Sequence, residues 1–89
     1  MTVVLKKSVN KNERYYNISI LANLFGDYIV ERIFGNTRYS SPTGNLKSIF
    51  TNKQEAYYYL EEILSIKIKK GYKIFSSSID TNYEHKRNI

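Results

Sequence analysis

The spacing of apolar residues changes once along this chain of 89 residues, and that change decides which folds are open to it. Up to residue 50, apolar and polar side chains alternate, which is the period of β-strands. From about residue 53 to residue 70, apolar side chains follow the period of an amphipathic helix. The alternating runs expected as strands are Thr2–Ser8, Arg14–Leu21, Tyr28–Phe34 and Leu46–Phe50. The sequence therefore predicts an α+β fold, a four-stranded antiparallel sheet with one long helix packed on one face.

Turn and cap residues mark the ends of these elements. Asn10–Glu13 is a polar turn that would join the first two strands in a hairpin. Asn23–Asp27 is a second turn, which contains a glycine able to adopt positive φ. Thr51 or Asn52 can cap the start of the helix, and Gly71 can end it in the left-handed conformation.

A chain of this length forms one domain at most. Residues 1–75 are expected to form it, including a segment after Gly71 that packs back on the sheet. Residues 76–89 are polar and weakly patterned, and we expect a flexible basic C-terminal tail. The chain has no cysteine and one histidine, which excludes a disulfide and a Cys/His zinc site. With no signal peptide or membrane span recognised, we expect a cytoplasmic protein without a membrane partner.

The chain carries 14 Lys and Arg against 8 Asp and Glu, a net charge of +6. In so small a domain this bias favours a polyanionic partner, most simply nucleic acid. The alternative is that the charge only keeps the protein dispersed in solution. Composition leaves both interpretations open.

Phe34 stands where the alternating pattern of the third strand stops, with Arg32 on its own face of the strand and Arg38 just beyond the break. An aromatic ring flanked by arginines can bind a nucleotide, with a sugar or base on the ring and phosphate on the cations. It can equally be a core aromatic at a bend. The loop from Thr37 to Asn45, which follows, holds the only proline and is expected to project from the sheet.

Groups able to carry out catalysis do not converge in this sequence. His85, the lone histidine, lies in the tail, where a histidine is usually solvated. Neither a G-x-S-x-G nucleophile turn nor a G-x-x-x-x-G-K-[ST] phosphate loop occurs. Glu61 and Glu62 are adjacent on the helix and so point in different directions. We therefore predict that the protein is not an enzyme and has no cofactor and no metal site.

Between Val3 and Tyr72 the chain resembles the WGR domain family in four consecutive segments. The family's opening hairpin is similar to VLKKSVNKNERYYNISI, and its turn and strand ending in Trp-Gly-Arg are similar to NLFGDYIVERIFGN. Gly44 and KSIF correspond to its glycine-containing hairpin and the strand that follows. The family's helix and closing Lys-Gly-Tyr are similar to TNKQEAYYYLEEILSIKIKKGY. The name-giving motif differs, because Phe-Gly-Asn stands here in place of Trp-Gly-Arg.

The resemblance implies a function. In DNA-dependent poly(ADP-ribose) polymerases, WGR domains bind DNA at strand breaks, where the tryptophan packs on the sugar of the terminal nucleotide and the basic hairpin contacts the backbone. On matching positions this implies Phe34 as the stacking ring and Asn12 and Arg14 as phosphate contacts. Asn36 lacks the charge of the family's arginine, which Arg38 is placed to supply from two residues away. The chain looks most like short bacterial proteins made of little more than this domain, so ADP-ribosyl transfer is not expected.

Together these observations predict a non-catalytic nucleic-acid-binding domain that contacts the sugar-phosphate backbone, with DNA favoured over RNA and duplex ends as the proposed place of contact. The predicted surface consists of Asn12, Arg14, Arg32, Phe34, Asn36, Arg38 and Lys47, with Lys86 and Arg87 as auxiliary charge. The alternative is a protein-protein interaction module that keeps the fold but has lost DNA binding. Its interface would draw on the tyrosines Tyr15, Tyr28, Tyr39, Tyr57 and Tyr58. The sequence makes no prediction about oligomeric state.

Overall fold

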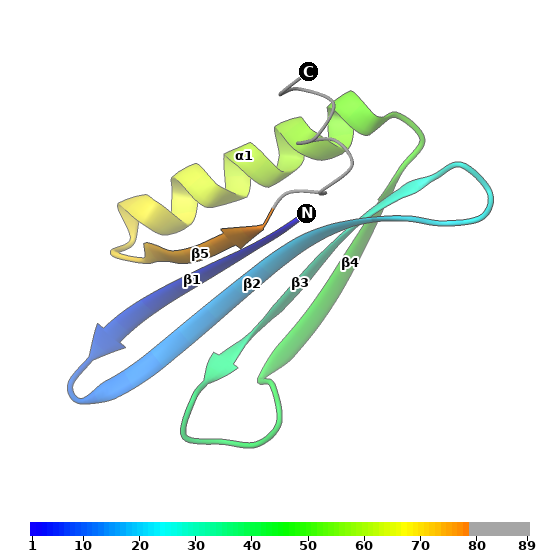
Figure 1. The fold of residues 1–89 in the computed structure, drawn as a ribbon. Coiled ribbons are helices and arrows are strands. Elements are labelled where there is room, and N and C mark those ends of the chain that lie inside the picture. Colours follow the sequence, from blue (N-terminus) through cyan, green and yellow to red (C-terminus); the bar gives the residue numbers. More distant parts are fainter. Residues whose placement is uncertain (79–89) are drawn as a thin grey trace.

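The structure is a computed structural model that describes residues 1–78 of the chain. Its elements are β1 (Thr2–Val9), β2 (Asn12–Ala22), β3 (Tyr28–Asn36), β4 (Gly44–Phe50), α1 (Lys53–Lys69) and β5 (Lys73–Ser78). The strands form one antiparallel sheet in the order β4-β3-β2-β1-β5, and α1 lies across one face of it (Figure 1). The predicted α+β class with a single helix on one face is confirmed. The sheet has five strands, one more than predicted.

The segment after the helix supplies this fifth strand. β5 pairs antiparallel with β1, with Lys73 opposite Lys6. Every residue of β5 is exposed, so the strand has no buried side whose alternation would reveal it in the sequence. Ser76–Ser78, expected as the start of the tail, form the end of this strand. The rest of the predicted tail, including Lys86 and Arg87, lies outside the described residues.

Two turns with left-handed residues set the registers of the first three strands. Asn10 and Lys11 have φ angles of 48° and 68°, the positive values that a two-residue type I′ hairpin turn requires. β1 accordingly pairs with β2 along its whole length, from Thr2 opposite Ser19 to the turn. The predicted glycine of the second turn, Gly26, has a φ of 84°. Both turns are thus where the sequence predicts them.

The helix is capped at both ends by the residue types that helix ends favour. The Oδ1 atom of Asn52 accepts hydrogen bonds from the backbone N–H groups of Gln54 at 2.7 Å and Glu55 at 3.4 Å. Asn52 rather than Thr51 is therefore the N-cap. After the C-terminal end of α1, Gly71 adopts a φ of 103°, as predicted for a left-handed cap.

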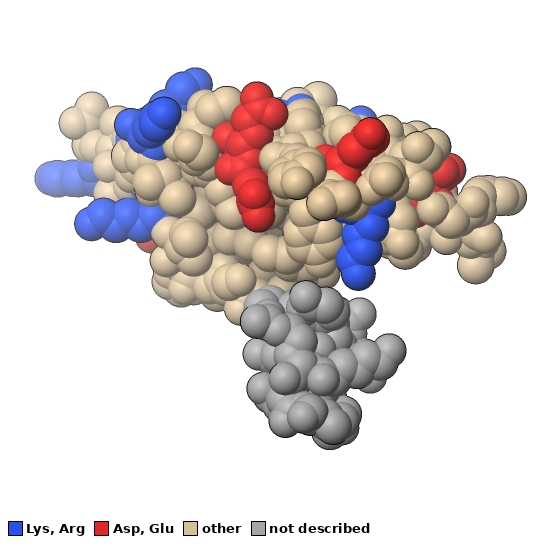
Figure 2. Space-filling view, turned by 90° about the horizontal axis from the view of Figure 1, so that it is seen from above, with Lys and Arg blue, Asp and Glu red and all other residues tan. Residues whose placement is uncertain are grey.

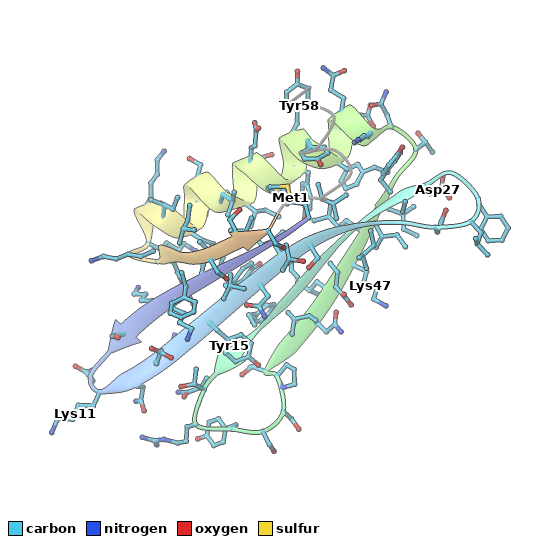
Figure 3. The ribbon with its side chains drawn as sticks, in the orientation of Figure 1. Met1, Lys11, Tyr15, Asp27, Lys47 and Tyr58 are labelled. Atoms are coloured by element: carbon cyan, nitrogen blue, oxygen red, sulfur yellow. The ribbon has the colours of Figure 1, made fainter. Side chains whose placement is uncertain are left out.

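The core lies between α1 and the face of the sheet that α1 covers. Its buried side chains are Val3, Leu5, Tyr16, Ile18, Ile20, Val30, Ala56, Leu60 and Ile63. On each strand they are two residues apart, so they point to one side. Burial of each larger aliphatic side chain stabilises the fold by about 1.5–3 kcal/mol. The opposite side of the sheet, which we call the open face, carries Tyr15 and Lys47 among others (Figure 3).

No helix among residues 1–78 has the length and apolar character needed to cross a membrane.

Candidate nucleic-acid interface

A pocket lies at the end of the sheet where β3 ends and β5 begins. Its volume is about 400 Å³, and it is lined by Arg14, Phe34, Gly35, Asn36, Tyr39, Thr43 and Tyr72. Three of these, Arg14, Phe34 and Asn36, belong to the predicted surface. The register explains why they meet, because Arg14 lies opposite Asn36 and Phe34 is two residues before Asn36 on the same face.

The Phe34 ring is half-buried and held by two contacts. It stacks on the Tyr16 ring with centroids 5.1 Å apart and an interplanar angle of 8°. Tyr16 in turn meets the edge of the Tyr72 ring at 6.1 Å. On its other side, Phe34 leans over Gly44 of β4, where a Cβ atom would lie only 2.6 Å from its Cε2 atom. Phe34 is therefore both a packed aromatic of the domain and a wall of the pocket.

Lysines lie against the same aromatic rings. The Nζ atom of Lys67 is 4.4 Å from the centroid of the Tyr16 ring and 5.9 Å from that of Tyr72. The Nζ atom of Lys7 is 5.8 Å from the centroid of Tyr72 and donates a hydrogen bond to the backbone oxygen of Lys70. Lys7 also lies opposite Arg14 in the sheet. We call Lys7, Arg14, Lys67 and Lys70 the basic cluster.

The pKa of Lys67 is lowered by its surroundings in this region. Burial lowers its pKa below the ordinary value of 10.5, and the charges of Lys70, Arg32 and Lys7 lower it further. Each of these three neighbours is a cation, so the folded chain places positive charges together against their mutual repulsion. A bound anion would relieve that repulsion and favour the charged form of Lys67.

Carboxylates do not compensate for the basic cluster within residues 1–78. The ion pairs there join Lys6 to Glu13 at 3.4 Å and Lys47 to Glu31 at 3.7 Å, and neither contains a member of the cluster. Seen from the helix side, basic side chains gather at the end of the molecule where α1 ends, and acidic ones lie over the middle of the helix (Figure 2). This end of the domain therefore presents a positive potential beside its aromatic pocket.

Arg32 faces the helix rather than the surface. Its Nη1 atom donates a hydrogen bond to the Tyr16 hydroxyl at 3.2 Å, and its guanidinium lies 5.6 Å from the centroid of the Tyr59 ring. Its Nε atom is buried and has no hydrogen-bond partner among the described residues. Arg32 therefore holds Tyr16 in place beside Phe34 and adds positive charge to the same face of the sheet.

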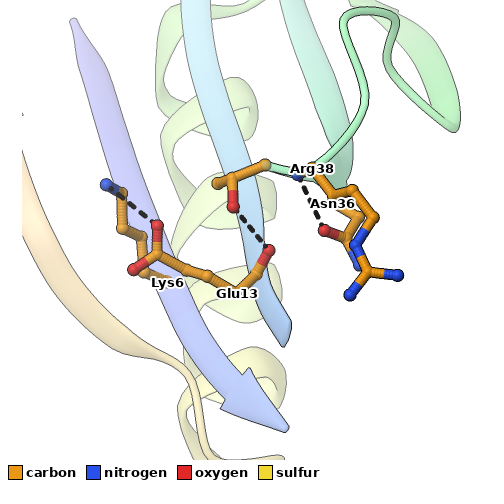
Figure 4. Close-up of polar contacts among 5 residues, drawn as sticks. Lys6, Glu13, Asn36 and Arg38 are labelled. Atoms are coloured by element: carbon orange, nitrogen blue, oxygen red, sulfur yellow. Dashed lines mark hydrogen bonds and ion pairs between the residues drawn. The ribbon is translucent and has the colours of Figure 1, made fainter. Parts of the chain in front are cut away.

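The two predicted residues at the end of β3 shape the loop that follows. Asn36 accepts, through Oδ1, a hydrogen bond of 2.9 Å from the backbone N–H of Arg38, whose side chain is exposed (Figure 4). Thr37 ties the same loop to β2, because its backbone N–H and its hydroxyl both donate to the carbonyl oxygen of Glu13. Asn12, the first residue of β2, is half-buried and lies on the face of Arg14.

Lys47 lies apart from the other predicted residues. Its partner across the β3–β4 pair is Glu31, next to the buried Val30, so both side chains of the ion pair point to the open face (Figure 3). The pocket lies on the covered face. Of the seven predicted residues, Arg14, Phe34 and Asn36 line the pocket, and Arg38 follows them in the loop. Asn12 and Arg32 share their face of the sheet, and Lys47 is on the other side.

The sequence-based prediction omitted the residues that complete the site: Lys7, Tyr16, Lys67 and Tyr72. Lys67 carried a signal, because it falls four residues after the buried Ile63 on the apolar stripe of α1. A lysine in that stripe places its charge over the end of the sheet. The contacts of Tyr16 and Tyr72 depend on strand register and on the position of β5, which the sequence pattern did not show.

Metal-binding side chains are not grouped in this part of the chain. Within residues 1–78, no three His, Cys, Asp or Glu side chains lie close enough together to hold a metal ion.

Comparison with known protein families gives a match. The model of the WGR domain family matches residues 1–78, which are also the residues that the structure describes. No curated protein and no solved structure matches the chain.

Proposed function

Because this chain belongs to the WGR domain family, whose domains generally bind nucleic acid, we propose that it is a non-catalytic domain that binds DNA through its sugar-phosphate backbone at duplex ends. The observation that carries the proposal is the basic cluster beside the stacked rings of Phe34 and Tyr16, since none of its members is in an ion pair with a carboxylate of residues 1–78. Cations next to an accessible aromatic wall suit a sugar on the ring and phosphates on the cations.

The shape of the site supports a terminal nucleotide as ligand. The Tyr72 side chain and the loop residues Tyr39 and Thr43 line the pocket together with Phe34. A single terminal sugar can enter such a recess, whereas a continuous duplex backbone would pass over it. In the proposal, the adjoining phosphates bind to Arg14 and Lys7, which are cross-strand neighbours.

The departure from the family motif has a counterpart in the structure. Asn36 uses its side-chain oxygen to fix the backbone of Arg38, so it organises the loop, and its amide carries no charge to offer a phosphate. In the proposal, Arg14 and Arg38 supply the positive charge on either side of Asn36. The proposed preference for DNA over RNA comes from the family resemblance. Binding is therefore to be measured with both DNA and RNA duplexes.

Fluorescence anisotropy with labelled duplexes tests the proposal. A duplex with open ends should bind with a Kd of about 1–100 μM at moderate salt, and affinity should fall steeply as salt rises. The same duplex closed by hairpin loops at both ends should bind more weakly, because it offers no terminal sugar. Equal affinity for both would refute end recognition, and a tighter complex with an RNA duplex would refute the preference for DNA.

A matched pair of charge variants separates the site from overall charge. Arg14→Gln and Lys47→Gln each remove one positive charge, the first beside the pocket and the second on the open face. Arg14→Gln should weaken binding and reduce the salt slope by about one unit, because one phosphate contact is lost. Lys47→Gln should change the affinity and the salt slope little. Equal effects would mean that binding follows net charge and not this pocket.

Phe34→Ala tests the aromatic contact. Loss of a ring that stacks on a nucleotide should weaken binding by about 1–3 kcal/mol.

If a folded wild-type protein binds no duplex even at low salt, the nucleic-acid proposal fails and the protein-interaction alternative takes its place.

A further inference from the structure

The end of the molecule opposite the basic cluster exposes large apolar side chains. In the turn between β2 and β3, Leu24 is 101% exposed and Phe25 88%. On the adjoining ends of β4 and β2, Ile49 is 67% exposed and Leu21 48%. Placing such side chains in water opposes the hydrophobic effect, and a group of them on one surface marks an interaction site.

The turn that presents Leu24 and Phe25 is held in one conformation. The Oδ1 atom of Asn23 accepts backbone N–H hydrogen bonds from Phe25 and Asp27, each at 2.9 Å. The backbone N–H of Asn23 donates to the carbonyl oxygen of Asp27 at 3.0 Å. Little backbone conformational entropy would therefore be lost when this turn is covered by a partner.

Apolar side chains of three neighbouring strands form a row across the sheet next to this turn. Leu21 on β2 lies opposite Ile29 on β3, and Ile29 lies opposite Ile49 on β4. All three point to the open face, because each follows or precedes a residue of the covered face by one position. This row adjoins the turn directly. We call Leu21, Leu24, Phe25, Ile29 and Ile49 the apolar corner.

We propose that the apolar corner binds the apolar corner of a second copy of this chain in a symmetric dimer. The exposed fractions of Leu21, Leu24, Phe25 and Ile49 together equal about three fully exposed side chains. At roughly 150–200 Å² for a large side chain, one corner offers about 500 Å², and two offer about 1,000 Å². This total reaches the size of roughly 1,000 Å² at which specific interfaces begin.

The distribution of charge favours a second copy as the occupant. The charged row next to the apolar corner is the Glu31–Lys47 ion pair, which carries no net charge. The basic cluster lies at the far end of β2, whose eleven residues span about 35 Å. Two corners can therefore meet while the positive ends point away from each other, beyond the Debye length of about 8 Å at physiological salt. The proposal does not depend on nucleic-acid binding.

Sedimentation velocity on nuclease-treated protein, from low micromolar to millimolar concentration, tests the dimer. The mass should rise from 10.5 kDa toward twice that value, and the dimer should persist at high salt because its interface is apolar. The double variant Leu24→Ser, Phe25→Ser should weaken the dimer by about a hundredfold or more. Both side chains lie in solvent, so the variant keeps the core, which circular dichroism would check.

The control is Tyr58→Ser, Ile68→Ser, which removes exposed apolar side chains from the helix instead. It should dimerise like the wild type. A wild-type protein that stays at 10.5 kDa throughout the range would overturn the proposal. Dimerisation of the corner variant with wild-type affinity, or loss of the dimer at high salt, would overturn it equally.

Discussion

Replacing Gly44 by alanine tests whether the packing of Phe34 depends on a glycine in the neighbouring strand. A Cβ atom at this position would lie 2.6 Å from Cε2 of Phe34 and closer still to Cζ. Carbon atoms in contact are normally about 3.5–4.0 Å apart, so the ring would have to retreat by about 1 Å or more. The backbone presents no obstacle, because Gly44 is not among the residues with positive φ.

The expected free-energy change combines three effects. Overpacking of this kind costs about 1–3 kcal/mol. Loss of the offset stack on Tyr16 adds about 0.5–1.5 kcal/mol. Against these, alanine in a strand is favoured over glycine by about 0.5–1 kcal/mol. Gly44→Ala should therefore lower the free energy of unfolding by about 1–3 kcal/mol, and it should weaken duplex binding because the ring leaves the pocket wall.

Urea unfolding of a double-mutant cycle measures the effect. In the Phe34→Ala background the ring is absent, so Gly44→Ala should no longer destabilise and should raise the free energy of unfolding by about 0.5–1 kcal/mol. The change in the free energy of unfolding caused by Gly44→Ala thus has opposite signs in the wild-type and Phe34→Ala backgrounds. If Gly44→Ala has the same effect in both, the contact between Gly44 and the Phe34 ring does not govern the packing, and the reasoning is refuted.

Two further substitutions probe the helix. Asn52→Ala should lower the free energy of unfolding, measured in urea, by about 1 kcal/mol because it removes the N-cap. Thr51→Ala is the control and should change the free energy of unfolding little. A larger effect at Thr51 than at Asn52 would contradict the observed cap. Lys67→Met should raise the urea midpoint at pH 7, because it removes a charge whose pKa is lowered by burial and by Lys70, Arg32 and Lys7. With a folded pKa below the unfolded value of 10.5, the unfolded chain holds the proton more strongly, so wild-type stability recovers as pH rises toward 10.5 and the advantage of the variant should shrink. An advantage that grows with pH would contradict the assigned direction.

The strands and helix that bury one side could be predicted from the sequence, because burial imposes a period. The alternation in β1 to β4 and the stripe of α1 both follow from the core they share. Turn and cap residues predicted where most of these strands and the helix begin or end, as at Gly26, Asn52 and Gly71. β5 buries none of its side chains and is held by its pairing with β1, so its sequence carries no such period.

The candidate site was predicted less completely, since it depends on which residues face each other across strands. Alternation placed Arg32 and Phe34 on one face, but only the position of α1 shows that Arg32 lies beneath it. Lys47 was assigned to the surface of Phe34, although the loop between β3 and β4 leaves their register open in the sequence. The observed register puts Phe34 opposite Gly44, three residues from Lys47, and an odd separation means opposite faces.

The position of β1 between β2 and β5 has a consequence for the synthesis of the chain. β1 leaves the ribosome well before β5, and contacts between such distant segments form late in folding. Until β5 arrives, one edge of β1 presents unpaired N–H and C=O groups, which are a template for pairing with other chains. A chain truncated before Lys73 would remain in that state. β5, with every residue exposed, thus adds little to the core and instead pairs the edge of a strand that contains Val3 and Leu5.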